Sequence, residues 1–210
     1  MADQLALSRL NTWFSPAFPT GGFAWSGGLE AACAKGLVKD KSSLLDWVKT
    51  ALTIGSARSD GILLVCAWQG EEVAEIAESL AVSPERWQES VEQGRAFLAA
   101  AKPWLAEPQP KASALPVLVG TITQRCGIDL ADALTAFLNA FILQQVQAGQ
   151  RLIPLGQAQA MEILAEIEPI LAEAVRKIAV STLDDLGTAT PMMDLCAMHH
   201  ATLPTRIFRS

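Results

Sequence analysis

Apolar residues recur at helical spacing along almost the whole chain, and this periodicity restricts the fold more than any other feature. One apolar stripe lies between residues 44 and 56, and others follow Pro84 and Pro116. Spacings of three and four residues place side chains on one face of a helix. No run of four or more residues alternates strictly between apolar and polar, so strands are not expected. The pattern predicts an all-α fold.

Prolines and capping residues divide this pattern into about eight to ten helices. Ser42 is expected to cap one helix, and the Ser83-Pro84 pair is expected to begin another. The chain has 210 residues and no internal repeat of about 20 to 50 residues. We therefore expect a single helical-bundle domain over residues 1–210.

The most apolar helix is expected in the second half of the chain. Asp129 should cap it, and it should run from Leu130 to about Gln147 and end at Gly149. Its apolar residues cover nearly the whole circumference, which predicts a central helix buried on most sides. The next helical pattern, residues 157–181, contains Pro169, which is placed to kink or split it.

Charge and hydropathy exclude two classes of partner. The chain carries 16 Lys and Arg against 22 Asp and Glu, a formal net charge of −6, whereas a nucleic-acid binder needs a concentrated basic face. No apolar stretch reaches the roughly 20 residues of a membrane span. Residues 1–13 lack the basic and apolar regions of a signal peptide. We expect a cytoplasmic protein whose four widely spaced cysteines are free.

A glycine-rich segment, residues 19–30, is the least ordinary part of the sequence. Four glycines surround two aromatic residues, Phe23 and Trp25, which permits a tight turn and close approach of the backbone. A phosphate-binding loop would need Lys and then Ser or Thr after its second glycine, and here Gly27 leads to Gly28. The segment is better explained as a structural turn or a partner-binding loop than as a nucleotide site.

Three metal-ligand types lie close together near the end of the chain. On a helix, Cys196 and His200 are four residues apart and His199 lies beside them, and thiolate and imidazole suit nickel, copper or zinc. Adjacent histidines point about 100° apart, however, and two or three ligands make an incomplete site. Packing of Cys196 with a hydrogen-bonded histidine is the favoured interpretation, and a metal shared across a dimer axis stays open.

The sequence contains few residues that could form a catalytic site. A nucleophile needs a nearby base and a group that orients it, and only Cys196 or a distant serine could pair with the chain's two histidines. The nucleophile-elbow and zinc-protease motifs are both missing from the sequence. We expect no enzyme, no catalytic residue and no cofactor, with a cysteine hydrolase as a rival.

The final segment, residues 203–210, couples apolar and basic residues. Ile207 and Phe208 are expected to be exposed, and Arg206 and Arg209 accompany them. Such a segment seldom folds alone, so it is expected to be disordered or to become ordered against a partner. Arginine and phenylalanine together are typical of interface anchors.

Three segments in the correct order resemble one family, that of the urease accessory protein UreF. The glycine-rich segment is similar to its signature S-P-x-x-P-x-G-x-F-x-[YW]-S-x-G-L-E, and residues 151–157 are similar to its R-x-[VI]-P-L-G-Q. The end of the chain, from His200 to Ser210, is similar to its H-x-x-x-x-[TS]-R-[LI]-F-R-S. The resemblance extends over nearly the whole chain.

The resemblance implies an all-α protein without chemistry of its own. Members form a complex with UreD (also called UreH), recruit the GTPase UreG and help deliver nickel to apo-urease, and they dimerise with the C-terminal tail ordered against UreD. This implies a scaffold that couples GTP hydrolysis to nickel insertion. The expected partner-binding residues are in the glycine-rich segment and the tail: Gly21, Gly22, Phe23, Trp25, Ser26, Glu30, His200, Thr205, Arg206, Phe208 and Arg209. The alternative is a nickel metallochaperone that uses Cys196, His199 and His200.

Overall fold

The computed structural model describes residues 4–210, and all regular secondary structure in this part of the chain is helical. It contains ten α-helices, so the predicted all-α class and helix number are confirmed for these residues. The α-helices are α1 Gln4–Trp13, α2 Leu29–Ala34, α3 Lys41–Ile54, α4 Ser56–Trp68, α5 Ala74–Ser79, α6 Pro84–Ala101, α7 Leu115–Arg125, α8 Leu130–Leu152, α9 Gln157–Ile178 and α10 Pro191–His199. Four short 3-10 helices accompany them: η1 Gly22–Ala24, η2 Lys102–Trp104, η3 Leu183–Asp185 and η4 His200–Thr202.

Capping side chains begin α3, α6 and α8, and one of the predicted caps is misplaced. The Ser83 side chain accepts from the Arg86 amide at the start of α6, as predicted. The prediction that Ser42 caps α3 is wrong. Asp40 is the N-cap, because its carboxylate accepts from the Ser43 amide while the Ser43 hydroxyl accepts from the Asp40 amide. This reciprocal pair satisfies two backbone donors that a helix start leaves free.

The central helix α8 is longer than predicted. It starts after Asp129, as expected, but continues through Gly149 to Leu152. A Cβ atom at Gly149 would lie 2.4 Å from Cδ2 of Leu44 in α3. This glycine therefore serves close helix packing and does not end the helix. Similarly, α9 runs through Pro169 without being split.

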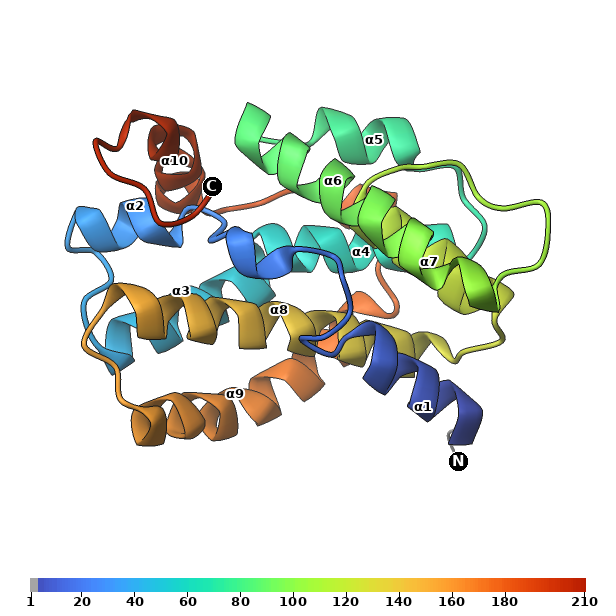
Figure 1. Cartoon of the computed structure of the whole chain (residues 1–210), viewed down its shortest axis with the longest axis horizontal. Helices are drawn as coiled ribbons and strands as arrows, with labels where there is room; N and C mark the ends of the chain where they lie inside the picture. Colours follow the sequence, from blue (N-terminus) through green and yellow to red (C-terminus); the bar gives the residue numbers. More distant parts are fainter. Residues whose placement is uncertain (1–3) are drawn as a thin grey trace.

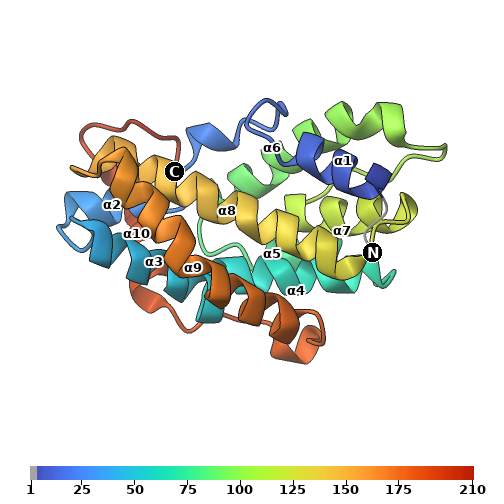
Figure 2. The same cartoon turned by 90° about the horizontal axis from the view of Figure 1, so that it is seen from below.

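The helices pack around one continuous cluster of buried apolar side chains, to which α3, α4, α7, α8 and α9 contribute most. The helices α4 and α7 pack closely at Gly120, where a Cβ atom would lie 2.3 Å from the Leu64 carbonyl oxygen. Figure 2 shows α8 lying beside α9 along most of its length. None of the helices in residues 4–210 is both long and apolar enough to cross a membrane.

The two ends of the described chain lie at opposite ends of the molecule (Figure 1). The helix α1 packs near the beginning of α8, and the segment that follows crosses α8 before it reaches α2. The helix α10 packs against α2 and α6. As a result, residues 203–210 lie beside the glycine-rich segment, although about 180 residues separate the two in sequence.

Candidate functional site

The tail of residues 203–210 is joined to the glycine-rich segment by the carboxylate of Glu30, the second residue of α2. Oε1 of Glu30 accepts from the Ile207 amide at 2.6 Å. Oε2 accepts from the Phe208 amide at 3.0 Å and pairs with Nε2 of His200 at 2.7 Å. Glu30 is only 5% exposed, so one buried carboxylate gathers donors from two places in the C-terminal segment.

The contacts of Glu30 stabilise its ionised form. Burial by itself raises the pKa of this carboxyl group, because a charge loses hydration in the interior. The two backbone amides and His200 outweigh this effect, and the pKa lies below its ordinary value of 4.5. Glu30 is therefore a carboxylate at neutral pH.

Backbone hydrogen bonds also pair the tail with the glycine-rich segment. The Arg209 amide donates to the Ala24 carbonyl at 2.8 Å, and the Ser26 amide donates to the Ser210 carbonyl at 2.8 Å. The Ser26 hydroxyl donates to the same Ser210 carbonyl. These bonds satisfy backbone groups that lie outside the α-helices.

Two arginines cover aromatic rings where the segments meet. The Arg209 guanidinium lies 4.4 Å from the centre of the Trp25 ring and bonds both oxygens of Glu92 in α6, at 2.7 and 3.1 Å. The Arg151 guanidinium lies 4.2 Å from the centre of the Phe208 ring and donates to the Phe23 carbonyl at 3.0 Å. Each arginine thus combines a cation–π contact with hydrogen bonds.

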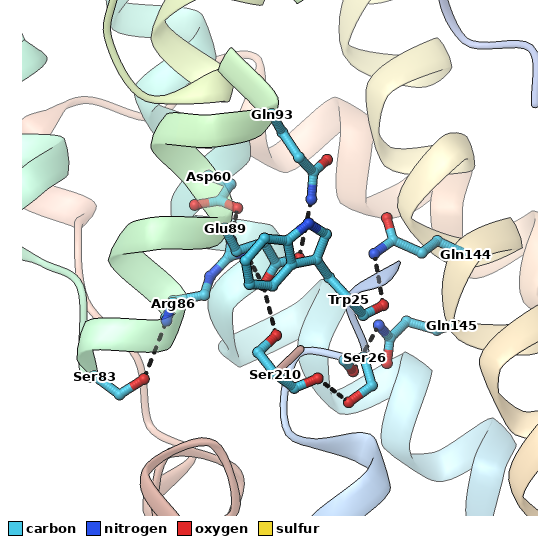
Figure 3. Close-up of polar contacts among 10 residues, drawn as sticks. All are labelled: Trp25, Ser26, Asp60, Ser83, Arg86, Glu89, Gln93, Gln144, Gln145 and Ser210. Carbon is cyan, nitrogen blue, oxygen red and sulfur yellow. Dashed lines mark hydrogen bonds and ion pairs between the residues drawn. The ribbon is translucent and has the colours of Figure 1, made fainter. Parts of the chain in front are cut away.

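Polar side chains of α8 reach the glycine-rich segment from one side (Figure 3). Gln144 donates to the Trp25 carbonyl, and Gln145 donates to the Ser26 carbonyl, both at 3.1 Å. The amide oxygen of Gln145 is also used, because Oε1 accepts from the Trp47 indole N–H at 3.1 Å. Buried amide groups with their hydrogen bonds made fix the segment at little energetic cost.

A charged group in α4 and α6 lies next to this contact. Arg86 forms an ion pair with Asp60 and a second one with Glu89, whose Oε2 lies 3.1 Å from Nη1 of Arg86. The same carboxylate receives the Ser210 hydroxyl at 3.4 Å (Figure 3). Burial raises the pKa of Asp60, although the charge of Arg86 opposes this effect. The end of the tail therefore contacts a largely buried network of charges.

A cavity of about 550 Å³ lies between α1, α6, α8 and the glycine-rich segment. Aromatic side chains including Trp13, Phe97 and Phe141 line it, and Phe208 and Arg151 contribute from the tail side. Phe208 is thus part of the interior. The prediction that Phe208 is exposed is wrong, because this residue is only 5% exposed and is buried within its own chain. Ile207 is exposed, as predicted, at 56%.

The structure brings most of the predicted partner-binding residues together, but it divides them into two sets. The side chains of Trp25, Ser26, Glu30, His200 and Phe208 are buried and occupied by contacts within the chain. Phe23 is 74% exposed, and Thr205, Arg206 and Arg209 are also exposed. Gly21 and Gly22, which are partly buried, form the turn before Phe23, and Gly21 has a φ of +73°.

The candidate metal ligands are not brought together. Cys196 is buried, and its pKa is raised by burial, which disfavours both a ligating and a catalytic thiolate. His200 is occupied by Glu30, and His199 is exposed. No cluster of three or more His, Cys, Asp or Glu side chains suited to a metal ion is found in residues 4–210. The four cysteines are free, as predicted.

Several residues at this site were not predicted as site residues. Gln144 and Gln145 could have been noticed, because two adjacent glutamines interrupt the most apolar helix of the sequence. Arg151 belongs to the motif of residues 151–157, which was matched without a role for its side chain. Glu89 and Glu92 carried no signal, because acidic residues on a surface helix are common.

Comparison with known proteins decides the family. The family model described as UreF matches residues 38–168. A urease accessory protein UreF of Rhizobium leguminosarum bv. viciae is 46% identical over 215 residues, which cover 98% of this chain and 96% of that protein. The UreF of Brucella ovis is 45% identical over 98% of this chain and 94% of its own length.

The chain belongs to the UreF family of urease accessory proteins. This confirms the family that the three motifs indicated. A UreF of Rhizobium etli, 44% identical over 98% of this chain, adds a third relative of the same description. This family consists of accessory proteins without catalytic activity. Membership of the family therefore confirms the prediction that the chain is not an enzyme.

Proposed function

We propose that this protein is a scaffold in urease maturation: together with UreD/UreH it recruits the GTPase UreG and couples GTP hydrolysis to nickel insertion into apo-urease. Within the complex it acts as a homodimer. The observation that carries the proposal is the joining of the glycine-rich segment to the tail, which creates one surface from two distant parts of the chain. We call this the loop–tail surface and define it by its exposed or partly exposed members: Gly21, Gly22, Phe23, Thr205, Arg206, Ile207 and Arg209.

The chemistry of the loop–tail surface suits a protein partner. Phe23 and Ile207 are large apolar side chains that are exposed to solvent. Exposed apolar residues among polar ones are typical of docking sites. Arg206 places positive charge there, although the whole chain carries a net charge of −6, while the charge of Arg209 is paired with Glu92. The surface therefore fits a partner that offers an apolar pocket with an acidic rim.

The remaining part of the proposal is that the scaffold carries no nickel itself. The three candidate ligands differ in their surroundings: Cys196 is buried, His199 is exposed and His200 is paired with Glu30. A scaffold needs surfaces and fixed geometry, and the loop–tail surface supplies both through buried hydrogen bonds. This supports recruitment of partners over direct metal transport.

Co-purification with purified UreD, followed by addition of UreG and GTP, tests the proposal. The double variant Phe23→Ala, Ile207→Ala is expected to lower the recovery of the complex about tenfold or more, since both apolar anchors are lost. Val180→Ala is the matched control, because Val180 is also exposed but lies after α9, outside the loop–tail surface. Full recovery of the complex with the double variant would overturn the proposed surface.

A further inference from the structure

One buried side chain carries a large share of the attachment of residues 203–210. The carboxylate of Glu30 accepts from the amides of Ile207 and Phe208 and from His200. Hydrogen bonds to an ionised group are roughly twice as strong as those between neutral groups. His200 Nδ1 has no partner and is buried, so Nε2 is the ring atom through which His200 is held.

The other contacts of the tail are the backbone hydrogen bonds of Arg209 and Ser210 with the glycine-rich segment, one ion pair and a few packed side chains. Among residues 203–210 only Phe208 and Ser210 are buried, with Leu203 partly buried against the core, so most of the tail removes little apolar surface from water. The ion pair of Arg209 with Glu92 is solvent-exposed, and exposed ion pairs contribute little to stability. Segments with few buried apolar contacts can open locally while the core stays folded.

We propose that Glu30 is the positioning residue of the tail: its carboxylate holds residues 203–210 docked, in a local equilibrium that is separate from the folding of the helical core. In the docked state Ile207 lies outward beside the glycine-rich segment, and Phe208 closes one side of the aromatic cavity. In the undocked state the loop–tail surface loses its four tail members and keeps only its three members in the glycine-rich segment. A role for tail docking in partner binding rests on the proposed function, whereas the docking equilibrium itself does not.

The contacts of Glu30 indicate which substitution removes its charge while keeping the shape of the side chain. Glu30→Gln keeps the size of the side chain but leaves one acceptor oxygen for three donors. Its amide NH2 group would face either the Ile207 amide or the pair formed by Phe208 and His200. At least one buried donor then loses its partner, which favours the undocked tail. Glu30→Asp keeps the charge on a shorter side chain and should rescue part of the docking.

Limited proteolysis of the full chain measures docking directly. Trypsin cleaves after arginine, and cleavage after Arg206 requires that the amides of Ile207 and Phe208 leave Glu30. The rate at which residues 207–210 are lost, followed by intact mass, therefore reports the undocked fraction. Glu30→Gln should raise this rate about tenfold or more, the scale of losing one hydrogen bond to a charged group. Glu30→Asp should fall between Glu30→Gln and the wild type.

Glu92→Gln is the matched control, because Glu92 contacts the same tail through the exposed Arg209. It should change the rate by less than about threefold, as expected for an exposed pair. A Glu30→Gln rate equal to that of the wild type would overturn the proposal. So would a Glu92→Gln rate as high as that of Glu30→Gln.

The wild-type chain gives an independent test that needs no variant. If docking is local, the rate of tail loss should rise only slightly with low concentrations of urea, because little surface is exposed. A dependence as steep as that of global unfolding, measured by circular dichroism, would overturn the proposal. Both tests use the isolated chain, so they are decided without UreD or UreG. A failed co-purification would leave them unaffected.

Discussion

At the scale of single residues, Glu30 shows how a side chain acquires its role from distant parts of the chain. Its neighbours in α2 are apolar residues such as Leu29 and Ala31, and nothing among them requires a buried carboxylate. Its donors come instead from His200, Ile207 and Phe208. The family motif indicated that Glu30 belongs to a functional segment, but only the structure shows what the carboxylate contacts.

The lowered pKa of Glu30 leads to a prediction about acid. A carboxyl group whose pKa is lower in the folded state stabilises the fold above its unfolded pKa, and this contribution is lost as the pH falls through the folded value. Since the pKa of Glu30 lies below 4.5, its contribution should be complete at neutral pH and should disappear below pH 4.5.

Urea unfolding of the wild type and of Glu30→Gln checks this expectation. The amide cannot ionise, so the difference in unfolding free energy between the two proteins should be largest at neutral pH and should shrink below pH 4.5. A difference that stays constant to well below that pH would show that the charge of Glu30 does not contribute.

At the scale of secondary structure elements, two glycines allow close helix packing. The Gly120 contact with α4 involves the backbone of Leu64, and the Gly149 contact with α3 involves the side chain of Leu44. A backbone neighbour cannot rotate away, whereas a leucine side chain can adopt another rotamer. Gly120 is therefore the stricter of the two positions.

Gly120→Ala should lower the free energy of unfolding by about 2 kcal/mol, the usual cost of overpacking a core. The added Cβ would lie 2.3 Å from the Leu64 carbonyl oxygen, so α4 and α7 must move apart. Gly156→Ala is the control, since Gly156 has a negative φ and nothing closer than 4.0 Å. The prediction is checked by urea unfolding of both variants, and equal stabilities would contradict it.

The same elements show what could be predicted from sequence. Helix type and most boundaries followed from local rules, as at Ser83 and Asp129, because caps and apolar spacing act within a few residues. The predicted end of α8 at Gly149 was wrong because this glycine is required by the close contact with Leu44, about a hundred residues away in sequence. The burial of Phe208 was missed for the same reason: its surroundings come from other elements.

At the scale of the whole molecule, the protein joins a helical core to one irregular surface. The candidate metal ligands near that surface take part in its architecture: Cys196 is packed and His200 holds the tail through Glu30. The close approach of α10 to Gly28 adds to this, because a Cβ there would lie 2.8 Å from the Ala197 amide nitrogen. The C-terminal region is thus organised for packing.

Nickel binding by the isolated chain should therefore be weak and should not depend on Cys196. Equilibrium dialysis of the wild type and of Cys196→Ala is expected to give the same binding curve within error, because a buried thiol with a raised pKa is a poor ligand. Tight binding that is lost in Cys196→Ala would contradict this and would favour the nickel metallochaperone. His199→Gln serves as the comparison for an exposed imidazole.

The separation of Glu30 from its three donors also has a consequence for the order of events during synthesis. These donors follow Glu30 by 170, 177 and 178 residues. Until they leave the ribosome the carboxylate has only water as a partner, while α3 to α9 can already pack. The loop–tail surface is therefore assembled last, so a nascent chain does not display it before its core is formed.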